Sequence, residues 1–343
     1  MAAYISFQPS DFFNTKLYTG TGSSLAITGV GFQPDFVWTK NRDATDNHNL
    51  FDSPRGVREF ISSNTTSVET TGADSLNSFD SDGFTLGTWG DVNGSGEDYV
   101  SWNWKGGTTS GLSGGTITPS AYSFNTTSGF GIYKYTGTGA NATIPHGLGV
   151  APHLVIVKHL SGASDWEVGS TSYTSWAYHQ GLNLNNAESS SATCWNSTAP
   201  TSTVFSVGTN GAINGSGQTY VAYVFANVKG YSKMGTYTGN GNADGPFIYT
   251  GFRPAFAIRK ILDSTDSWYL TDSKRLGYNP QNDYLFANAT QTESSLTRFD
   301  FLSNGIKIRT TDGGDNGNGN TYMYIAFAEF PFVSSNSKAG TAR

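Results

Sequence analysis

Short runs rich in β-branched and aromatic residues follow three prolines, Pro34, Pro152 and Pro254. The first run reads FVWTK over residues 36–40, and its partners read LVIVK and FAIRK at the matching places. Successive side chains of a strand point to opposite faces, so the two aromatic residues and the lysine of the first run share one face. β-branched and aromatic residues favour strands. Each run therefore predicts a strand that begins just after its proline.

Each of these strands lies inside a longer unit that occurs three times along the chain. The unit opens with Tyr-Thr-Gly-x-Gly, at residues 18–22, 135–139 and 237–241. It closes with Asn-Gly-x-Gly and a strand that starts at a tyrosine, as at Tyr99. Between these blocks stand a glycine, a proline and a lysine at fixed spacing: Gly31, Pro34, Lys40, Gly149, Pro152, Lys158, Gly251, Pro254 and Lys260. Ordered blocks at near-constant spacing predict an internal repeat in which these nine residues are structural.

The repeat predicts an all-β fold of three tandem β-sandwich domains of jelly-roll or lectin-like type. Gly, Ser, Thr and Asn interrupt every window that could form a long helix, and each unit has the usual size of one sandwich. The Asn-Gly-x-Gly blocks suit tight hairpin turns onto the strands just before them. The expected parts are an N-terminal head over 1–17, which either anchors on a partner or docks on the first repeat, repeat one over 18–105, a Gly/Ser/Thr linker over 106–118, repeat two over 119–229, repeat three over 230–333 and a C-terminal tail over 334–343.

Charge and composition exclude several classes of protein. Only 13% of the 343 residues are charged, the net charge is −6, and no basic cluster occurs, so a nucleic-acid partner is not expected. No apolar stretch reaches the ~18 residues of a membrane helix, so membrane insertion is not expected, and the first residues show no secretory signal. The single cysteine, Cys194, excludes an internal disulfide framework and favours a small buried thiol.

Residues with catalytic or metal-binding chemistry are present without a recognisable arrangement. The five histidines, among them His179, are interpreted as surface or turn residues rather than metal ligands. Asp312, Asp315 and Asn316 form a weak Ca²⁺ candidate, with a polar hairpin tip as the alternative. Acids that could serve a glycosidase are Asp80, Asp82, Glu97 and Asp98 in repeat one and Asp165 and Glu167 in repeat two, but neighbouring acids in Gly- and Asn-rich turns are usually solvated or bind calcium. We therefore expect a protein that is not an enzyme and that has no cofactor apart from this candidate Ca²⁺.

Tryptophans in the variable middle of each repeat are the remaining sign of function. Trp89, Trp176 and Trp195 lie away from the repeated strands, where aromatic faces on loops could stack on sugar rings. The alternative is that these side chains fill cores, because Trp is mostly buried. Trp166 and Trp268 stand eight residues after the lysine in repeats two and three, and this matched placement favours a structural role.

The repeated blocks resemble a family of virion proteins of tailed phages, especially marine phages. The similar segments are GFQPDFVWTKNR, GVAPHLVIVKH, GYSKMGTYTGNGNADGPFIYTGFRP and the terminal TYMYIAFAEFPFVSSN, within residues 4–336. Members are described as tail fibre or minor structural proteins, and no catalytic residues come with the resemblance. It implies location on the virion surface, on the tail or a head appendage, and host attachment through a glycan or protein receptor. It also implies contacts with other virion proteins and with copies of the same chain, a homotrimer by analogy with tail fibres.

Two alternatives to the tail-fibre interpretation stay open at this point. The chain could be a capsid decoration or vertex protein without a receptor role, or a secreted glycan-binding or glycan-degrading module. Many tens of copies per particle would distinguish a decoration protein from a fibre, and released glycan products would distinguish an enzyme from either.

Overall fold

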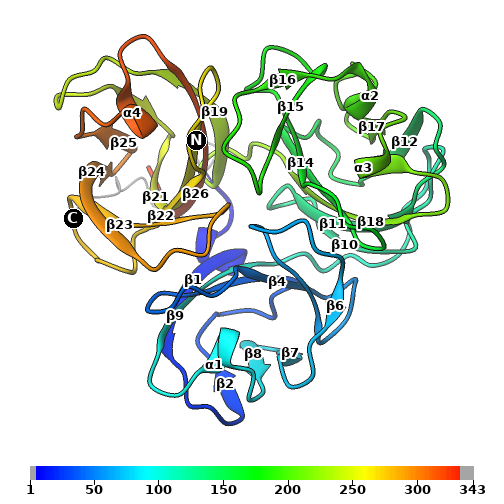
Figure 1. The fold of residues 1–343 in the computed structure, drawn as a ribbon, viewed down its shortest axis with the longest axis horizontal. Coiled ribbons are helices and arrows are strands. Elements are labelled where there is room, and N and C mark those ends of the chain that lie inside the picture. The colour runs from blue at the N-terminus through cyan, green and yellow to red at the C-terminus, as the bar shows by residue number, and fades with distance from the viewer. Residues whose placement is uncertain (1–4, 333–343) are drawn as a thin grey trace.

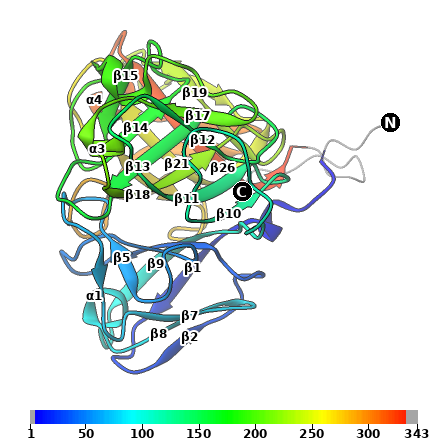
Figure 2. The same ribbon diagram turned by 90° about the vertical axis from the view of Figure 1, so that its right-hand side faces the viewer.

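Strands form nearly all the regular structure of the computed structural model, which describes residues 5–332. The predicted all-β class is confirmed, and the α-helices of the described chain are single turns of four residues. No helix within residues 5–332 is long and apolar enough to span a bilayer. Figure 1 shows three lobes around a common centre, coloured blue to cyan, green, and yellow to red, and Figure 2 gives the side view.

The elements divide among the three lobes in chain order. Lobe one contains the 3₁₀ helix η1 (Pro9–Asp11), β1 (Phe13–Thr19), β2 (Leu25–Ile27), β3 (Phe36–Asn41), β4 (Asn49–Asp52), β5 (Glu59–Ile61), β6 (Thr70–Thr71), β7 (Leu76–Asp80), β8 (Gly83–Leu86), α1 (Gly90–Asn93) and β9 (Asp98–Trp104). Lobe two contains β10 (Ala121–Asn125), β11 (Phe130–Thr136), β12 (Ala142–Pro145), β13 (Leu154–His159), β14 (Glu167–Ser170), β15 (Tyr178–Gly181), β16 (Ser189–Ser190), α2 (Ala192–Trp195), β17 (Val204–Val207), α3 (Gly211–Asn214) and β18 (Thr219–Phe225). Lobe three contains β19 (Ser232–Thr238), β20 (Phe247–Tyr249), β21 (Phe252–Ile261), β22 (Tyr269–Asp272), β23 (Gln281–Phe286), β24 (Ser294–Leu302), β25 (Gly305–Ile308), α4 (Gly313–Asn316) and β26 (Thr321–Pro331).

Each lobe contains one long antiparallel sheet with the same arrangement of strands. The order is β1-β9-β3-β4-β5-β6 in lobe one, and β11-β18-β13-β14-β15-β16 and β19-β26-β21-β22-β23-β24 match it in the other two. The closing strand of each repeat pairs with the strand after the proline, so Trp38 lies opposite Trp102, and Ile156 lies opposite Tyr223. Shorter pairings form the second layer of each lobe: β2-β8-β7 and β12-β17 are separate sheets, whereas β20-β25 continues the sheet of lobe three through β24. Apolar side chains fill the space between the two layers of each lobe.

The Asn-Gly-x-Gly blocks build a buried corner and not the expected hairpin. In lobe two, Asn214 Nδ2 donates to the carbonyls of Ala140 and Gly208, and its Oδ1 accepts from the Thr138 backbone. The Tyr220 hydroxyl accepts from the Gly215 amide and donates to the Gly211 carbonyl. The same contacts occur around Asn93 with Tyr99 and around Asn316 with Tyr322. The short helix therefore carries the chain from the small sheet to the long sheet, because a two-residue hairpin cannot cross between layers.

The glycine of each Tyr-Thr-Gly block is required by this corner. A Cβ at Gly20, Gly137 or Gly239 would lie 2.2, 2.4 or 2.3 Å from a carbonyl oxygen of the facing Asn-Gly turn. No side chain fits at that distance, since these oxygens belong to backbone. The first and last blocks of each repeat thus recur together because they contact each other.

The largest core of the molecule is shared by the three lobes. The long sheets turn their large side chains toward one another, so that Phe36, Trp104, Tyr223, Phe225 and Phe327 belong to one buried cluster. The Phe36 and Tyr223 rings stack at 4.5 Å between centroids, and the Trp104 and Phe327 rings meet edge to face at 5.5 Å. At the axis these side chains leave an apolar cavity of only about 20 Å³. The strand formed by residues 36–40 is therefore buried on both faces: one face packs inside its own lobe and the other packs at the axis shared by the three lobes.

Two predicted boundaries need correction. The head over 1–17 is partly a strand, since β1 begins at Phe13 and pairs with β9, and Ile5 belongs to the shared core. The 106–118 linker is exposed over much of its length but is held to lobe two at separate points, because Thr108 bridges to Phe124 and Ile117 is buried. These segments lack periodic sequence patterns, so only their tertiary contacts reveal their place. The whole tail over 334–343, like Met1 to Tyr4, lies outside the described residues.

Candidate functional site

The interior of each lobe holds a different group of side chains at one matching place. Asp52, Ser170 and Asp272 pair with Phe36, Leu154 and Phe256, each of which stands two residues after the repeated proline. Three residues before them stand Asn49, Glu167 and Tyr269, whose side chains face the layer between the two sheets of their own lobe. This layer is apolar and aromatic in lobe one, rich in metal-ligating groups in lobe two, and ion-paired in lobe three.

Lobe two brings together Glu167 on β14, His179 on β15 and Cys194 on α2. One ligating atom of each lies within 4.8 Å of the others, and no other such group of three His, Cys, Asp or Glu residues occurs within residues 5–332. His179 Nδ1 lies 2.5 Å from Glu167 Oε2, and its Nε2 lies 3.1 Å from Ser189 Oγ. Glu167 stands opposite Gly181, so His179, two residues earlier on β15, lies diagonal to it.

The environment of this cluster favours the charged form of His179. Hydrogen bonding to Cys194 first, and to Glu167 second, raises the pKa of His179 to about 10 despite partial burial. Asn210 Nδ2 donates to Cys194 Sγ at 3.0 Å, and Cys194 itself is fully buried. The interpretation of His179 as a plain surface histidine and of Cys194 as an isolated buried thiol is therefore incomplete. The sequence could not predict this cluster, because its three residues lie on two strands and a helix that only the fold brings together.

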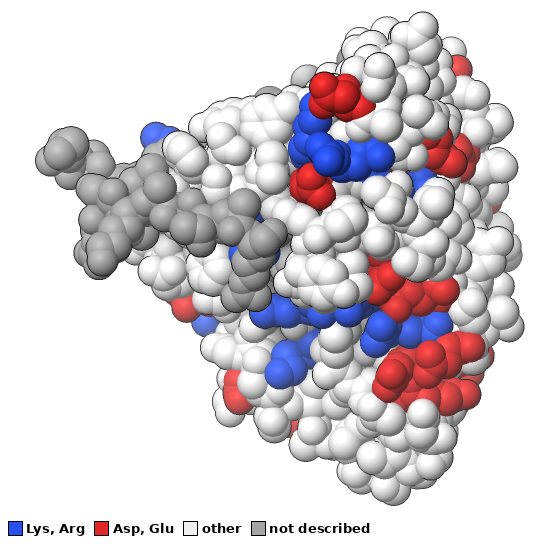
Figure 3. All heavy atoms as spheres, turned by 90° about the vertical axis from the view of Figure 1, so that its left-hand side faces the viewer, with Lys and Arg blue, Asp and Glu red and all other residues white. Residues whose placement is uncertain are grey.

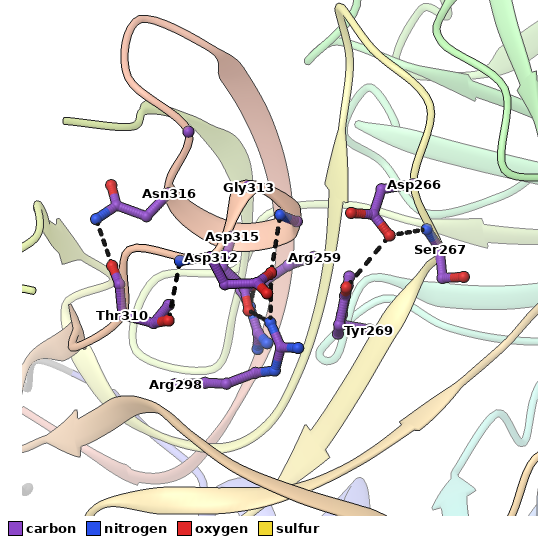
Figure 4. A network of polar contacts seen from close by, with 12 residues as sticks. Arg259, Asp266, Ser267, Tyr269, Arg298, Thr310, Asp312, Gly313, Asp315 and Asn316 are labelled. Carbon is purple, nitrogen blue, oxygen red and sulfur yellow. Dashed lines mark hydrogen bonds and ion pairs between the residues drawn. The ribbon is translucent and has the colours of Figure 1, made fainter. Parts of the chain in front are cut away.

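The matching layer of lobe three holds the candidate Ca²⁺ residues in an ion-paired network (Figure 4). Asp315 is fully buried and binds Arg259 at 2.5 Å and Arg298 at 2.6 Å. Burial alone would raise the pKa of Asp315, but the two guanidinium groups hold it below its usual value. Asp312 Oδ1 accepts from the Gly314 amide, and Asn316 donates to the Thr310 carbonyl. The cationic partners of the Asp315 carboxylate are thus arginines. Asp315 and Asn316 are fully buried in the corner at α4, so they do not form the polar hairpin tip of the alternative interpretation.

The tryptophans predicted on exposed loops are mainly core residues. Trp195 is fully buried and Trp176 is 7% exposed, and their rings meet edge to face at 6.0 Å. Trp89 is half-buried and packs against Phe60 at 4.6 Å. The prediction that Trp176 and Trp195 present free aromatic faces is therefore wrong, because the second sheet covers them. These tryptophans stand at different positions in the three repeats because each lobe packs a different core, and not because they lie on exposed loops.

Trp166 and Trp268 join neighbouring lobes, in line with the structural role expected for them. Trp166 Nε1 donates across to the Ser62 carbonyl at 2.9 Å, and Trp268 Nε1 donates to the Gly181 carbonyl at 3.0 Å. Both side chains belong to the shared core. The equivalent place in lobe one is His48, which accepts from Trp38 within the same lobe and also interacts with the Phe286 backbone of lobe three.

The repeated lysines are buried among backbone carbonyls. Lys158 donates to the carbonyls of Thr66 and Ser164, and thereby connects lobe two with lobe one. Lys260 similarly reaches the Asn185 carbonyl of lobe two, while Lys40 stays within lobe one. Burial lowers the pKa of each of these lysines to about 8. The structural role predicted from their spacing agrees with these contacts.

Three glutamates that the sequence did not single out occupy equivalent places between lobes. The backbone amides of Glu69, Glu188 and Glu293 donate to the carbonyls of Leu160, Leu262 and Arg42 respectively. Glu293 also binds Arg42 at 2.6 Å across the junction of lobes three and one. No repeated block surrounds these glutamates, so only the fold identifies them.

The surface of the molecule is sparsely charged and has shallow hollows. Figure 3 shows acidic and basic side chains in a few mixed clusters with uncharged surface between them. One open hollow of about 660 Å³ lies where lobe one meets the start of lobe two, lined by Gln33, Ser53, Lys105, Thr109 and Tyr122 among others. Asp35, at its base, already accepts from Ser53, Ser123 and the Gly106 amide, so this carboxylate holds the segment after β9 in place.

A family model described as "Domain of unknown function (DUF7483)" matches residues 8–331 of the chain. The chain therefore belongs to that family, and the family unit spans all three lobes rather than one repeat. No curated protein matches the chain. No solved structure matches it either.

Proposed function

We propose that this member of the DUF7483 family is a non-enzymatic structural protein of a phage virion. In this proposal three jelly-roll-like β-sandwich domains form one body of a tail fibre or appendage, which contacts a host-surface glycan or protein. Its partners are other virion proteins and further copies of the chain, with a trimer favoured because virion appendages sit on symmetric platforms. The resemblance of the repeated blocks to phage virion proteins supports the assignment to the particle.

The observation that carries the proposal is the closed aromatic axis. The largest side chains of all three long sheets pack against one another there, with a cavity of about 20 Å³ between them. A close-packed interior resists deformation and transmits force, which a surface appendage needs. Substrate pockets usually enclose about 300–1,000 Å³ and converge polar groups on a ligand, unlike this axis. The packed axis therefore fits a role in holding the three lobes, and the surfaces that they present, rigidly in place.

Host contact is proposed for a surface hollow, because Trp176 and Trp195 are buried and Trp89 is half-buried. The hollow beside Tyr122 combines a half-buried aromatic ring with amide, hydroxyl and ammonium groups from Gln33, Ser53 and Lys105. Sugars are recognised by this combination of an aromatic face and polar groups. We therefore propose that a glycan binds in this hollow.

Competition for adsorption tests the proposal. Purified protein added to host cells should reduce adsorption of the encoding phage, and Tyr122→Ala should weaken this effect. Leu184→Ala, at an exposed position on lobe two, is the matched control and should compete like the wild type. Protein that is present on particles in many tens of copies and does not compete would favour the decoration alternative. Release of glycan products by the purified chain would favour the enzymatic alternative.

A further inference from the structure

The cluster in lobe two has the donor set of a transition-metal site. It offers a carboxylate oxygen from Glu167, an imidazole nitrogen from His179 and a sulfur from Cys194, all within 4.8 Å of one another. Zinc binds these three atom types at about 2.0–2.3 Å, which places its ligand atoms roughly 3.3–3.8 Å apart in a tetrahedron. Small rotations of three side chains would bring the cluster to that spacing.

Neighbouring groups already orient two of the three ligands. The Asn210 amide is fixed because its Oδ1 accepts from the Ala212 backbone at 2.8 Å, so its Nδ2 faces the Cys194 sulfur. Ser189 Oγ lies 3.1 Å from His179 Nε2, which leaves Nδ1 facing Glu167. Outer hydrogen bonds of this kind set ligand orientation and basicity in metal sites. The cluster is therefore supported on two sides before any cation binds.

We propose that Glu167, His179 and Cys194 bind one Zn²⁺ ion, or a similar divalent transition metal, in lobe two. Three protein ligands leave one position of a tetrahedron, and the 20% exposed His179 side chain places that position toward solvent. The metal fastens α2 to β14 and β15, and thus joins the short helix to the long sheet. The Cys194 proton and the imidazolium proton pass to solvent on binding, because the metal takes the thiolate and the neutral imidazole.

The other lobes lack this donor set at the matching place. Lobe one has Asn49 and Phe60 where lobe two has Glu167 and His179, and lobe three has Tyr269 and Tyr284. The proposal therefore specifies one metal ion per chain. It is independent of the role proposed for the protein on a virion.

Calorimetric titration of Zn²⁺ into chelator-treated full-length protein tests the proposal. We expect one ion per chain, with proton release that is measured by repeating the titration in buffers of different ionisation enthalpy. Co²⁺ should produce visible d–d bands and a sulfur-to-cobalt charge-transfer band. Cys194→Ser should abolish the charge-transfer band, and His179→Gln should abolish tight binding, while circular dichroism verifies that each variant is folded.

Two further variants distinguish the site from adventitious binding. Asn210→Ala should weaken Zn²⁺ binding by about 10–100-fold, because it removes the donor that faces the sulfur. His159→Gln, which alters a histidine on the neighbouring strand outside the cluster, should bind like the wild type. Absence of a one-to-one site in the folded wild type would overturn the proposal. Equal affinity of wild type and His179→Gln, or a cobalt spectrum unchanged by Cys194→Ser, would also overturn it.

Discussion

The hydroxyl of Tyr223 in lobe two donates to the carboxylate of Asp52 in lobe one at 2.6 Å, and both groups are buried. Trp102 of lobe one makes the equivalent contact with Asp272 of lobe three at 3.0 Å. In lobe two the position equivalent to Asp52 and Asp272 is occupied by Ser170. The junctions of lobe one with lobe two and with lobe three therefore each contain a buried hydrogen bond to an aspartate. The junction between lobes two and three has Ser170 in place of the aspartate.

Removing the Asp52 carboxylate should destabilise the protein severely. Arg55 binds Asp52 at 2.5 Å with both side chains fully buried, so Asp52→Ala leaves a buried guanidinium without its main partner. The expected loss is about 3–5 kcal/mol of unfolding free energy, measured by urea denaturation. The double variant Asp52→Ser, Arg55→Tyr copies the Ser170 and Tyr173 of lobe two and should lose less. A single variant within about 1 kcal/mol of the wild type would contradict this account, given the usual cost of a broken buried pair.

Truncating a corner asparagine should also reduce stability. Asn214→Ala removes two donated and two accepted hydrogen bonds at a fully buried position. Buried groups without partners cost about 1–3 kcal/mol each, so we expect at least that loss in denaturant unfolding. Asn141→Ala, at an exposed position in the same lobe, is the control and should change little. Equal unfolding free energies of the two variants would show that the hydrogen bonds of the corner do not stabilise the fold.

Burial of the repeated lysines predicts a specific dependence on pH. The pKa of Lys158 is lowered to about 8 by burial, whereas an unfolded lysine titrates near 10.4. The unfolded state therefore binds more protons between about pH 8 and 10.4, and stability contributed at this site rises with pH in that window. The unfolding free energy of the wild type relative to Lys158→Met should increase from pH 8 to pH 10. Parallel pH profiles of the two proteins would contradict the assignment.

The shared core predicts that the three lobes unfold together. Differential scanning calorimetry of the full chain should show one cooperative transition, because separation of any lobe exposes the aromatic side chains of the axis. A fragment of residues 13–105 should aggregate or bind a hydrophobic dye, since Phe36, Trp38, Trp102 and Trp104 lose their cover. Three separate transitions, or a monomeric fragment that binds no dye, would show that the lobes are independent.

The sequence predicts those parts of the fold that depend on local pattern. The β-branched and aromatic runs after Pro34 and Pro152 located β3 and β13, whereas β21 begins at Phe252, before Pro254. The repeated asparagines and glycines marked the places where the chain turns, although they were predicted to form hairpins and they form corners between layers. It could not show which face of a strand meets another lobe, because residues 36–40 are buried on both faces. The mistaken exposure of Trp195 has the same origin, since the second sheet that covers it comes from distant segments. Glu167, His179 and Cys194 share no spacing motif, so only folding brings them together.

The central claim, that this chain is a structural component of a phage particle, is tested most directly by cryo-electron microscopy of the encoding phage. We predict three-lobed density with the outline of Figure 1 on the tail or its collar, at three or six copies or a similarly small symmetric number. Density spread over the capsid lattice would contradict the appendage role and support a decoration protein. Purified, infective particles that lack the chain would contradict the central claim itself.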